Sequence, residues 1–148
     1  MKLANFFWYL IFLIPWFLSG ILFRGDFHYY FELNLPVWAP KPIIFTFGWI
    51  ILYFLIAYSV CHVFKKSSSN YKIYLVINYF SNQLFLICFF GIKDLFLSLV
   101  DVLIVLISSM YLYVETKILK KRYSWYFIPY MIWNLVALIL MFSIFIMN

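Results

Sequence analysis

Five long apolar segments constrain this chain more than any other feature of its sequence. They cover residues 3–22, 42–64, 71–90, 95–116 and 124–147. Each has about the 20 residues that a helix needs to cross the hydrocarbon of a bilayer. Of the 148 residues, 68% are apolar and only 11% are charged, whereas soluble domains carry about 25% charged residues. The sequence predicts an all-α integral membrane protein, a five-transmembrane-helix bundle that forms a single domain over residues 1–148.

Two other interpretations of the apolar segments fail. A barrel would need alternating segments of about ten residues, and none is evident. The first segment could imitate a signal peptide, but it contains Pro15 and Trp16 and is followed by the bulky pair Phe23-Arg24 rather than by a small-x-small cleavage site. We therefore expect residues 3–22 to form the first span.

The charges between the segments predict the orientation of the bundle. Basic residues gather on one side: Lys2, then Lys65, Lys66 and Lys72, then Lys117, Lys120, Lys121 and Arg122. On the opposite side, the long loop 23–41 and the short loop around Lys93 and Asp94 are neutral overall. The positive-inside rule predicts a cytoplasmic N-terminus, an outer C-terminus and an outward-facing loop 23–41. The net charge of +6 thus indicates topology and contacts with anionic lipid, not nucleic acid.

Residues that could carry ordinary catalytic or metal chemistry are sparse. Cys61 and Cys88 lie in apolar segments without C-x-x-C spacing, so we expect reduced thiols in the core. His28 could ligate a haem iron, but a lone loop histidine is usually solvated. No hydrolytic triad, metal cluster or nucleotide-binding loop is visible, and we expect no metal site and no required cofactor.

Polar residues inside the apolar segments fall at one depth. They are Asn78, Asn82, Gln83, Asp101 and Asn134. At about 1.5 Å per residue, Asp101 lies about 9 Å below the outer end of its helix, and Asn82 lies roughly 17 Å above the inner end of its own. Helix-to-helix contacts alone could explain Asp101 and Asn78. The layer as a whole, from the midplane to the outer half of the membrane, predicts a ligand pocket.

Aromatic stripes reach the same layer. Phe45, Trp49 and Tyr53 recur every four residues on one helix face, and Tyr126, Pro129, Trp133 and Ala137 recur every three or four residues on another. Plain packing also produces such stripes. Tryptophan prefers the membrane interface, however, so the displacement of Trp49 and Trp133 toward the middle favours a pocket.

The order and spacing of these residues resemble the TspO/MBR family, the tryptophan-rich sensory proteins that include the mitochondrial translocator protein (peripheral benzodiazepine receptor). The matching residues are Pro36-Val37-Trp38-Ala39-Pro40, Phe45, Trp49, Tyr53, Ala57-Tyr58-Ser59, Asn78-Tyr79, Asn82-Gln83-Leu84, Asp101, Pro129-Tyr130, Trp133 and Ala137.

The resemblance implies a multi-pass protein of the bacterial cell membrane, commonly a homodimer, that binds porphyrins such as protoporphyrin and benzodiazepine-type compounds. The pocket would lie under loop 23–41, which would act as a lid. Carried over by motif, the ligand-binding residues are Tyr30, Trp38, Phe45, Trp49, Asn82, Gln83, Phe85, Trp133 and Ala137.

Two alternatives stay open. Trp49 and Trp133 could support light-dependent porphyrin degradation, as the resemblance implies for bacterial relatives, which would make the protein an enzyme. A tetrapyrrole or sterol transporter is the other alternative. The chain has no internal repeat of the transporter kind, and no Lys or Arg follows Arg122 to complete a C-terminal cholesterol pattern.

Overall fold

The computed structural model describes residues 3–22, 26 and 28–148. Lys2 and Arg24, which entered the orientation prediction, lie outside these ranges. The elements are α1 (Leu3–Leu22), α2 (Tyr29–Glu32), α3 (Pro42–Val63), η1 (Phe64–Lys66), α4 (Ser69–Leu86), η2 (Ile87–Ile92), α5 (Leu95–Ser124) and α6 (Phe127–Met147). No strand occurs in these ranges, so the prediction of an all-helical fold is confirmed.

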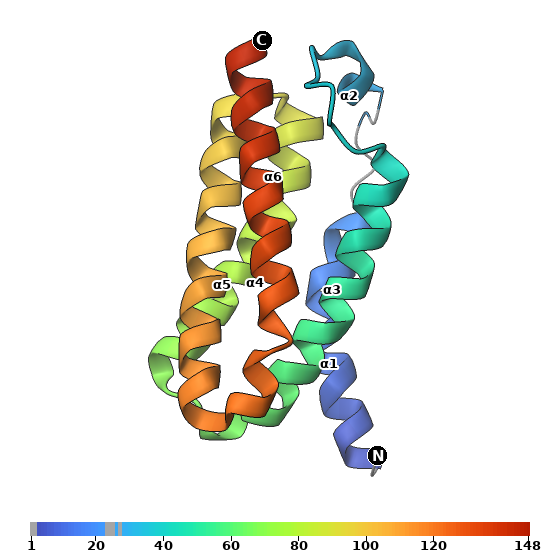
Figure 1. Cartoon of the computed structure of the whole chain (residues 1–148). Helices are drawn as coiled ribbons and strands as arrows, with labels where there is room; N and C mark the ends of the chain where they lie inside the picture. Colours follow the sequence, from blue (N-terminus) through green and yellow to red (C-terminus); the bar gives the residue numbers. More distant parts are fainter. Residues whose placement is uncertain (1–2, 23–25, 27) are drawn as a thin grey trace.

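The five long helices lie side by side, and the two chain ends lie at opposite ends of the bundle (Figure 1). Helix α5 packs most extensively, against α4 on one side and α6 on the other. Helix α1 packs against α3 and α4, and α3 also contacts α5 and α6. The short helix α2 lies at the same end of the bundle as the C-terminus (Figure 1).

The surface of the bundle is apolar along its length. Four stretches of the described chain are long and apolar enough to cross a membrane: Pro42–Lys66, Ser69–Ile92, Leu95–Ser124 and Phe127–Met147. Helix α1 adds a shorter apolar stretch, Phe6–Leu18. Large apolar side chains such as Ile51, Phe80 and Ile139 are exposed on several helices, and only lipid solvates such faces favourably. The chain is an integral, multi-pass membrane protein.

Helix α4 begins at Ser69, earlier than the expected Tyr71, because Ser68 caps it. The Ser68 hydroxyl accepts a hydrogen bond from the Tyr71 N–H at 3.0 Å. The Ser68 N–H and hydroxyl in turn donate to the two Glu115 oxygens at 2.7 and 2.8 Å. Glu115 thereby ties the start of α4 to α5.

Helix α5 continues to Ser124, although the sequence analysis ended this span at Thr116 and began the next at Ser124. The basic residues after Thr116 suggested a loop, but lysine and arginine are good helix formers. Lys120 leaves helical geometry (φ −153°, ψ 85°), which kinks the helix, and its ammonium donates to the His62 carbonyl at 3.0 Å. Helix α6 consequently begins at Phe127.

Asn78 joins four helices in the centre of the bundle. Its side-chain oxygen accepts from the Trp16 indole N–H (3.3 Å) and from the Tyr130 hydroxyl (3.0 Å). Its amide nitrogen donates to the Ser108 hydroxyl at 2.9 Å. All four side chains are buried. Apolar burial scarcely distinguishes a neighbouring helix from lipid, so directional polar contacts of this kind set how membrane helices pack.

Replacing Asn78 by alanine tests this arrangement. The change leaves the Trp16 and Tyr130 donors without their acceptor, at about 1–3 kcal/mol for each buried unsatisfied group. We expect Asn78→Ala to lower the free energy of unfolding by about 2–4 kcal/mol, measured by denaturant titration in detergent. The control is Asn70→Ala in the exposed first turn of α4, expected to change it by less than about 0.5 kcal/mol. Equal effects of the two changes would contradict the central role of Asn78.

Candidate functional site

A cavity of about 430 Å³ lies between the helices, within the range of about 300–1,000 Å³ typical of small-molecule sites. Every long helix and α2 contribute to its wall. The lining residues are Trp16, Phe17, Tyr30, Pro40, Pro42, Phe45, Thr46, Trp49, Ile50, Tyr53, Asn82, Phe85, Leu86, Phe89, Phe90, Asp101, Val102, Val105, Asn134, Ala137, Leu140, Met141 and Ile144. The wall is therefore mostly apolar and rich in aromatic rings.

The α3 side of the wall is an aromatic stripe. Phe45, Trp49 and Tyr53 follow one another at four-residue spacing and all line the cavity. The Phe45 and Trp49 ring centroids lie 6.0 Å apart in edge contact, and Trp49 stacks on Tyr53 at 5.6 Å. The stripe identified from spacing is thus a continuous aromatic surface in the structure.

A π-helical segment, η2, forms another part of the wall. It directly follows α4, and Phe89 within it stacks on Phe85 with centroids 5.5 Å apart. Phe90 in the same segment also lines the cavity. The wider π turn shifts the phase of the residues that follow it. Phe89 lies four residues after the predicted Phe85, so helical spacing could have identified it. Phe90 is one position further along and reaches the wall through the π turn, which nothing in the local sequence signals.

Hydrogen-bonded polar groups form one part of the wall. The Asn82 amide donates to the Tyr130 hydroxyl at 3.0 Å and to the Asn78 carbonyl at 2.7 Å. The Tyr53 hydroxyl donates to the Asn82 side-chain oxygen at 3.1 Å. These bonds connect the cavity wall to the Asn78 centre of the bundle and hold Asn82 in one orientation.

Asp101 and Asn134 also line the cavity, and both are buried, at 5% and 0% exposure. Ser81 lies within hydrogen-bonding reach of the Asp101 carboxyl. In the described part of the chain, however, the Asp101 Oδ2 and Asn134 Oδ1 atoms have no hydrogen-bond partner.

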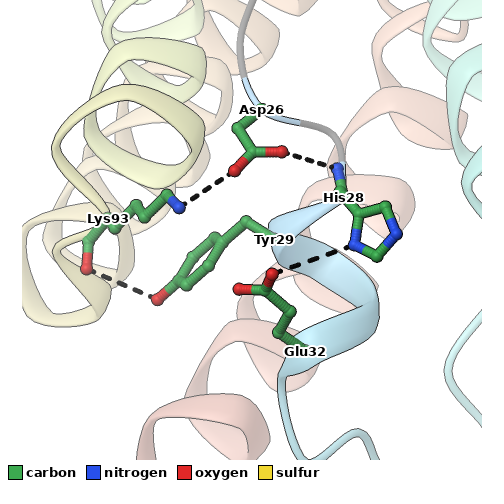
Figure 2. A network of polar contacts seen from close by, with 5 residues as sticks. All are labelled: Asp26, His28, Tyr29, Glu32 and Lys93. Carbon is green, nitrogen blue, oxygen red and sulfur yellow. Dashed lines mark hydrogen bonds and ion pairs between the residues drawn. The ribbon is translucent and has the colours of Figure 1, made fainter.

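The described residues around α2 (26 and 28–40) are called the α2 segment below. A polar network ties this segment to the loop before α5. Figure 2 shows the Asp26 carboxylate between the Lys93 ammonium, at 3.0 Å, and the His28 N–H, at 3.1 Å. The Tyr29 hydroxyl donates to the Lys93 carbonyl at 3.4 Å, and the Lys93 ammonium lies 4.9 Å from the Tyr29 ring centroid. The hydrogen bond from Lys93 lowers the pKa of Asp26 and raises that of Lys93. Lys93 itself has a left-handed backbone (φ 61°).

Other bonds hold this segment over the cavity. The Tyr30 hydroxyl donates to the Pro40 carbonyl at 3.1 Å, and both residues line the cavity. The Asn34 N–H donates to the Asn148 side-chain oxygen at 2.9 Å, and the Asn148 amide donates back to the Asn34 carbonyl at 3.1 Å. The segment is thus fastened to the loop before α5 and to the end of α6.

Most of the predicted ligand-binding residues line this one cavity: Tyr30, Phe45, Trp49, Asn82, Phe85 and Ala137. Gln83 does not, because consecutive helical residues point about 100° apart and its amide donates to the Pro15 carbonyl at 2.6 Å on the α1 side. Trp38 is half-exposed in the segment before α3 and is not part of the wall.

Trp133 lies beside the cavity rather than in its wall. Its indole packs on Gly48, where an added Cβ would lie 2.5 Å from the ring, and its ring centroid is 5.4 Å from that of Phe45. Trp133 therefore supports Phe45 from the contact between α3 and α6. Only glycine at position 48 leaves room for this contact, which the spacing of the aromatic residues could not show.

Trp16 and Phe17 also line the cavity, from α1, although neither was predicted from the sequence. The sequence did carry a signal for Trp16. Like Trp49 in the second span, Trp16 lies well inside its span and not at the membrane interface that tryptophan prefers. Among the described residues, no three His, Cys, Asp or Glu side chains form a metal-binding group.

The Asp26–Lys93 pair gives a test of how α2 is held. At pH 7, Lys93→Met should raise amide hydrogen exchange over residues 29–32 about two- to fivefold, as expected for losing one exposed ion pair. Lys41→Met is the control, since it removes a cation near the same end but leaves the pair intact. Because the pKa of Asp26 is lowered, the pair persists at pH 7 and is lost only as the pH falls through that lowered pKa, below about 4. Identical exchange in the two variants would show that the pair does not hold α2.

Comparison with known proteins adds an independent line of information. The model described as the TspO/MBR family matches residues 6–147. Tryptophan-rich protein TspO of Bacillus cereus is 33% identical over 135 residues, covering 89% of this chain and 88% of that protein. The uncharacterized membrane protein YtaB of Bacillus subtilis is 32% identical over 134 residues, covering 88% and 86%. The tryptophan-rich sensory protein of Cereibacter sphaeroides is 28% identical over 125 residues, covering 80% and 75%.

Proposed function

Because the chain belongs to the TspO/MBR family, we propose that it is a membrane binding protein for flat hydrophobic ring compounds. Porphyrins such as protoporphyrin, and benzodiazepine-type compounds, are the proposed ligands, held in the cavity between the helices. The observation that carries this proposal is the aromatic wall of a cavity of about 430 Å³. Rings stack favourably on such side chains, and a few polar groups suffice to orient them.

Two aromatic surfaces support the binding of a flat ring. Helix α3 supplies the contact series Phe45, Trp49 and Tyr53, and α4 with η2 supplies the stacked pair Phe85 and Phe89. A planar compound that lies along either surface exchanges water or lipid contacts for ring stacking. The α2 segment, fastened by Asp26, Tyr29 and Asn34, is the proposed lid at the outer end.

Trp49 gives the sharpest test of this function. Its indole lines the cavity, so Trp49→Ala should weaken protoporphyrin binding by roughly tenfold or more, about 1.4 kcal/mol. The shift of the porphyrin absorbance band on titration of the purified protein measures this without relying on tryptophan fluorescence. Trp125→Ala is the matched control, since Trp125 is 62% exposed just before α6, and it should leave the affinity unchanged. Unchanged affinity in Trp49→Ala would remove the cavity as the porphyrin site.

We also propose that the N-terminus is cytoplasmic, that the C-terminus and the α2 segment face outward, and that the protein lies in the bacterial cell membrane. The support is the charge distribution. Lys65 and Lys66 lie next to the start of α4, and Lys121 lies near the end of α5. At the other end, Lys93 is neutralised by Asp26.

Cysteine labelling tests this orientation in a background of Cys61→Ala and Cys88→Ala. Val37→Cys lies on the fully exposed part of the α2 segment and Lys66→Cys lies at the opposite end. A membrane-impermeant maleimide should label Val37→Cys in intact cells, and Lys66→Cys only after permeabilisation. The reverse pattern would invert the proposed orientation.

A further inference from the structure

A second, smaller cavity lies at the end of the bundle opposite α2. Helix α3 starts beside α2 and runs to this end, where α1 begins (Figure 1). The cavity has a volume of about 190 Å³ and is lined by Trp8, Phe12, Cys61, His62, Phe64 and Lys65. Sites that enclose a whole small molecule have about 300–1,000 Å³. An occupant of this smaller cavity therefore enters it with one end only.

One wall of the smaller cavity carries a positive charge. The Lys65 ammonium lies 5.4 Å from the centroid of the Trp8 ring, and Lys65 forms no ion pair with a carboxylate of the described residues. An ammonium has three N–H donors, and the face of one aromatic ring compensates its charge only in part. Lys65 can therefore donate hydrogen bonds to an anionic group that enters the cavity.

Another wall holds the imidazole of His62 in a fixed orientation. Its ring centroid lies 4.4 Å from those of both Tyr58 and Tyr123. The Nδ1 atom lies 2.8 Å from the Tyr58 carbonyl, which can only accept, so Nδ1 carries the hydrogen. In the neutral ring Nε2 is then an acceptor, and no described residue donates to it. A hydroxyl group in the cavity can donate to this atom.

The remaining walls are apolar and lie where a membrane interface is expected. Trp8 is 40% exposed near the start of α1, and tryptophan is enriched at the level of lipid headgroups. The rings of Phe12 and Phe64 pack with centroids 4.7 Å apart. A basic pocket between helices at this level is typical of a binding site for the headgroup of an anionic lipid.

We propose that the smaller cavity binds an anionic glycerophospholipid whose headgroup carries hydroxyl groups, as that of phosphatidylglycerol does. The Lys65 ammonium donates to the phosphate, and Nε2 of His62 accepts from a headgroup hydroxyl. The acyl chains stay in the bilayer, beside the apolar rings. Because ammonium–phosphate hydrogen bonds are strong, Lys65 supplies affinity, whereas His62 distinguishes between lipids of equal charge. The two cavities share no lining residue, so this lipid site is independent of the function proposed above.

Two neighbouring lysines give a matched test of the lipid site. Lys65 lines the cavity, whereas Lys66 is also exposed but lies outside its wall. Native mass spectrometry of the delipidated protein, titrated with phosphatidylglycerol in detergent, measures the affinity of the first bound lipid. Lys65→Met should weaken binding at least about fivefold, and Lys66→Met less than about twofold. Equal losses in the two variants overturn the site, because they show only a general attraction between the basic end and anionic lipid.

Two lipids of equal charge test the role of His62. Phosphatidylethanol is an anionic phosphodiester like phosphatidylglycerol, but its headgroup has no hydroxyl. At about pH 8, the unmodified protein should bind phosphatidylglycerol at least about threefold more tightly. His62→Phe, which keeps a stacking ring, should bind the two lipids equally. A preference retained in His62→Phe overturns the assignment of His62. Equal binding by the unmodified protein overturns it as well, without any need for the variant to fold.

A soluble compound distinguishes a lipid from a free phosphate ester. Glycerol 3-phosphate has the same headgroup chemistry without acyl chains, and an excess of it should leave phosphatidylglycerol bound. Full displacement overturns the lipid assignment and indicates a water-soluble phosphate ester as the occupant. Far-UV circular dichroism checks that Lys65→Met and His62→Phe keep the helical content of the unmodified protein, so that lost binding reports on the cavity.

Discussion

Inside a bilayer a polar side chain has no water to bond with, and every helix of this protein carries its few polar groups under that constraint. Asn78 meets the constraint by accepting from Trp16 and Tyr130 and donating to Ser108. Three helices are thereby held against α4 at one level. Apolar packing against lipid is nearly as favourable as packing against protein, so these few bonds, together with close side-chain packing, determine how the helices are arranged.

The cavity lies beside this polar centre and depends on it. Asn82 is fixed by Tyr53 and Tyr130, so this part of the wall keeps a defined shape while the aromatic residues of α3, α4 and η2 form the rest. Asp101 Oδ2, Asn134 Oδ1 and the Trp133 indole nitrogen are the exceptions, because these buried atoms have no hydrogen-bond partner among the described residues. The polar network therefore both stabilises the bundle and holds one part of the cavity wall in place.

The end of the cavity next to α2 is held by weaker, more exposed contacts. Asp26 and Lys93 are about half-exposed in their ion pair, and exposed pairs contribute little to stability. Tyr29, Tyr30 and Asn34 add single hydrogen bonds. A segment fastened in this way can open at a small free-energy cost while the central network stays intact, which is what a lid over a buried site requires.

Much of this could be predicted from the sequence, because membrane thickness and helical periodicity are simple constraints. Apolar length predicted the helical spans, and four-residue spacing correctly placed Phe45, Trp49 and Tyr53 on one surface. Tertiary structure decided what the spacing could not: which of the neighbours Asn82 and Gln83 faces the cavity, the π turn that brings Phe90 into the wall, and the close contact of Trp133 with Gly48. Each depends on a neighbouring helix, whose position follows from buried polar bonds between residues far apart in the sequence. Local patterns determine which face of a helix is apolar or aromatic, but the partner of that face is fixed only when the bundle forms.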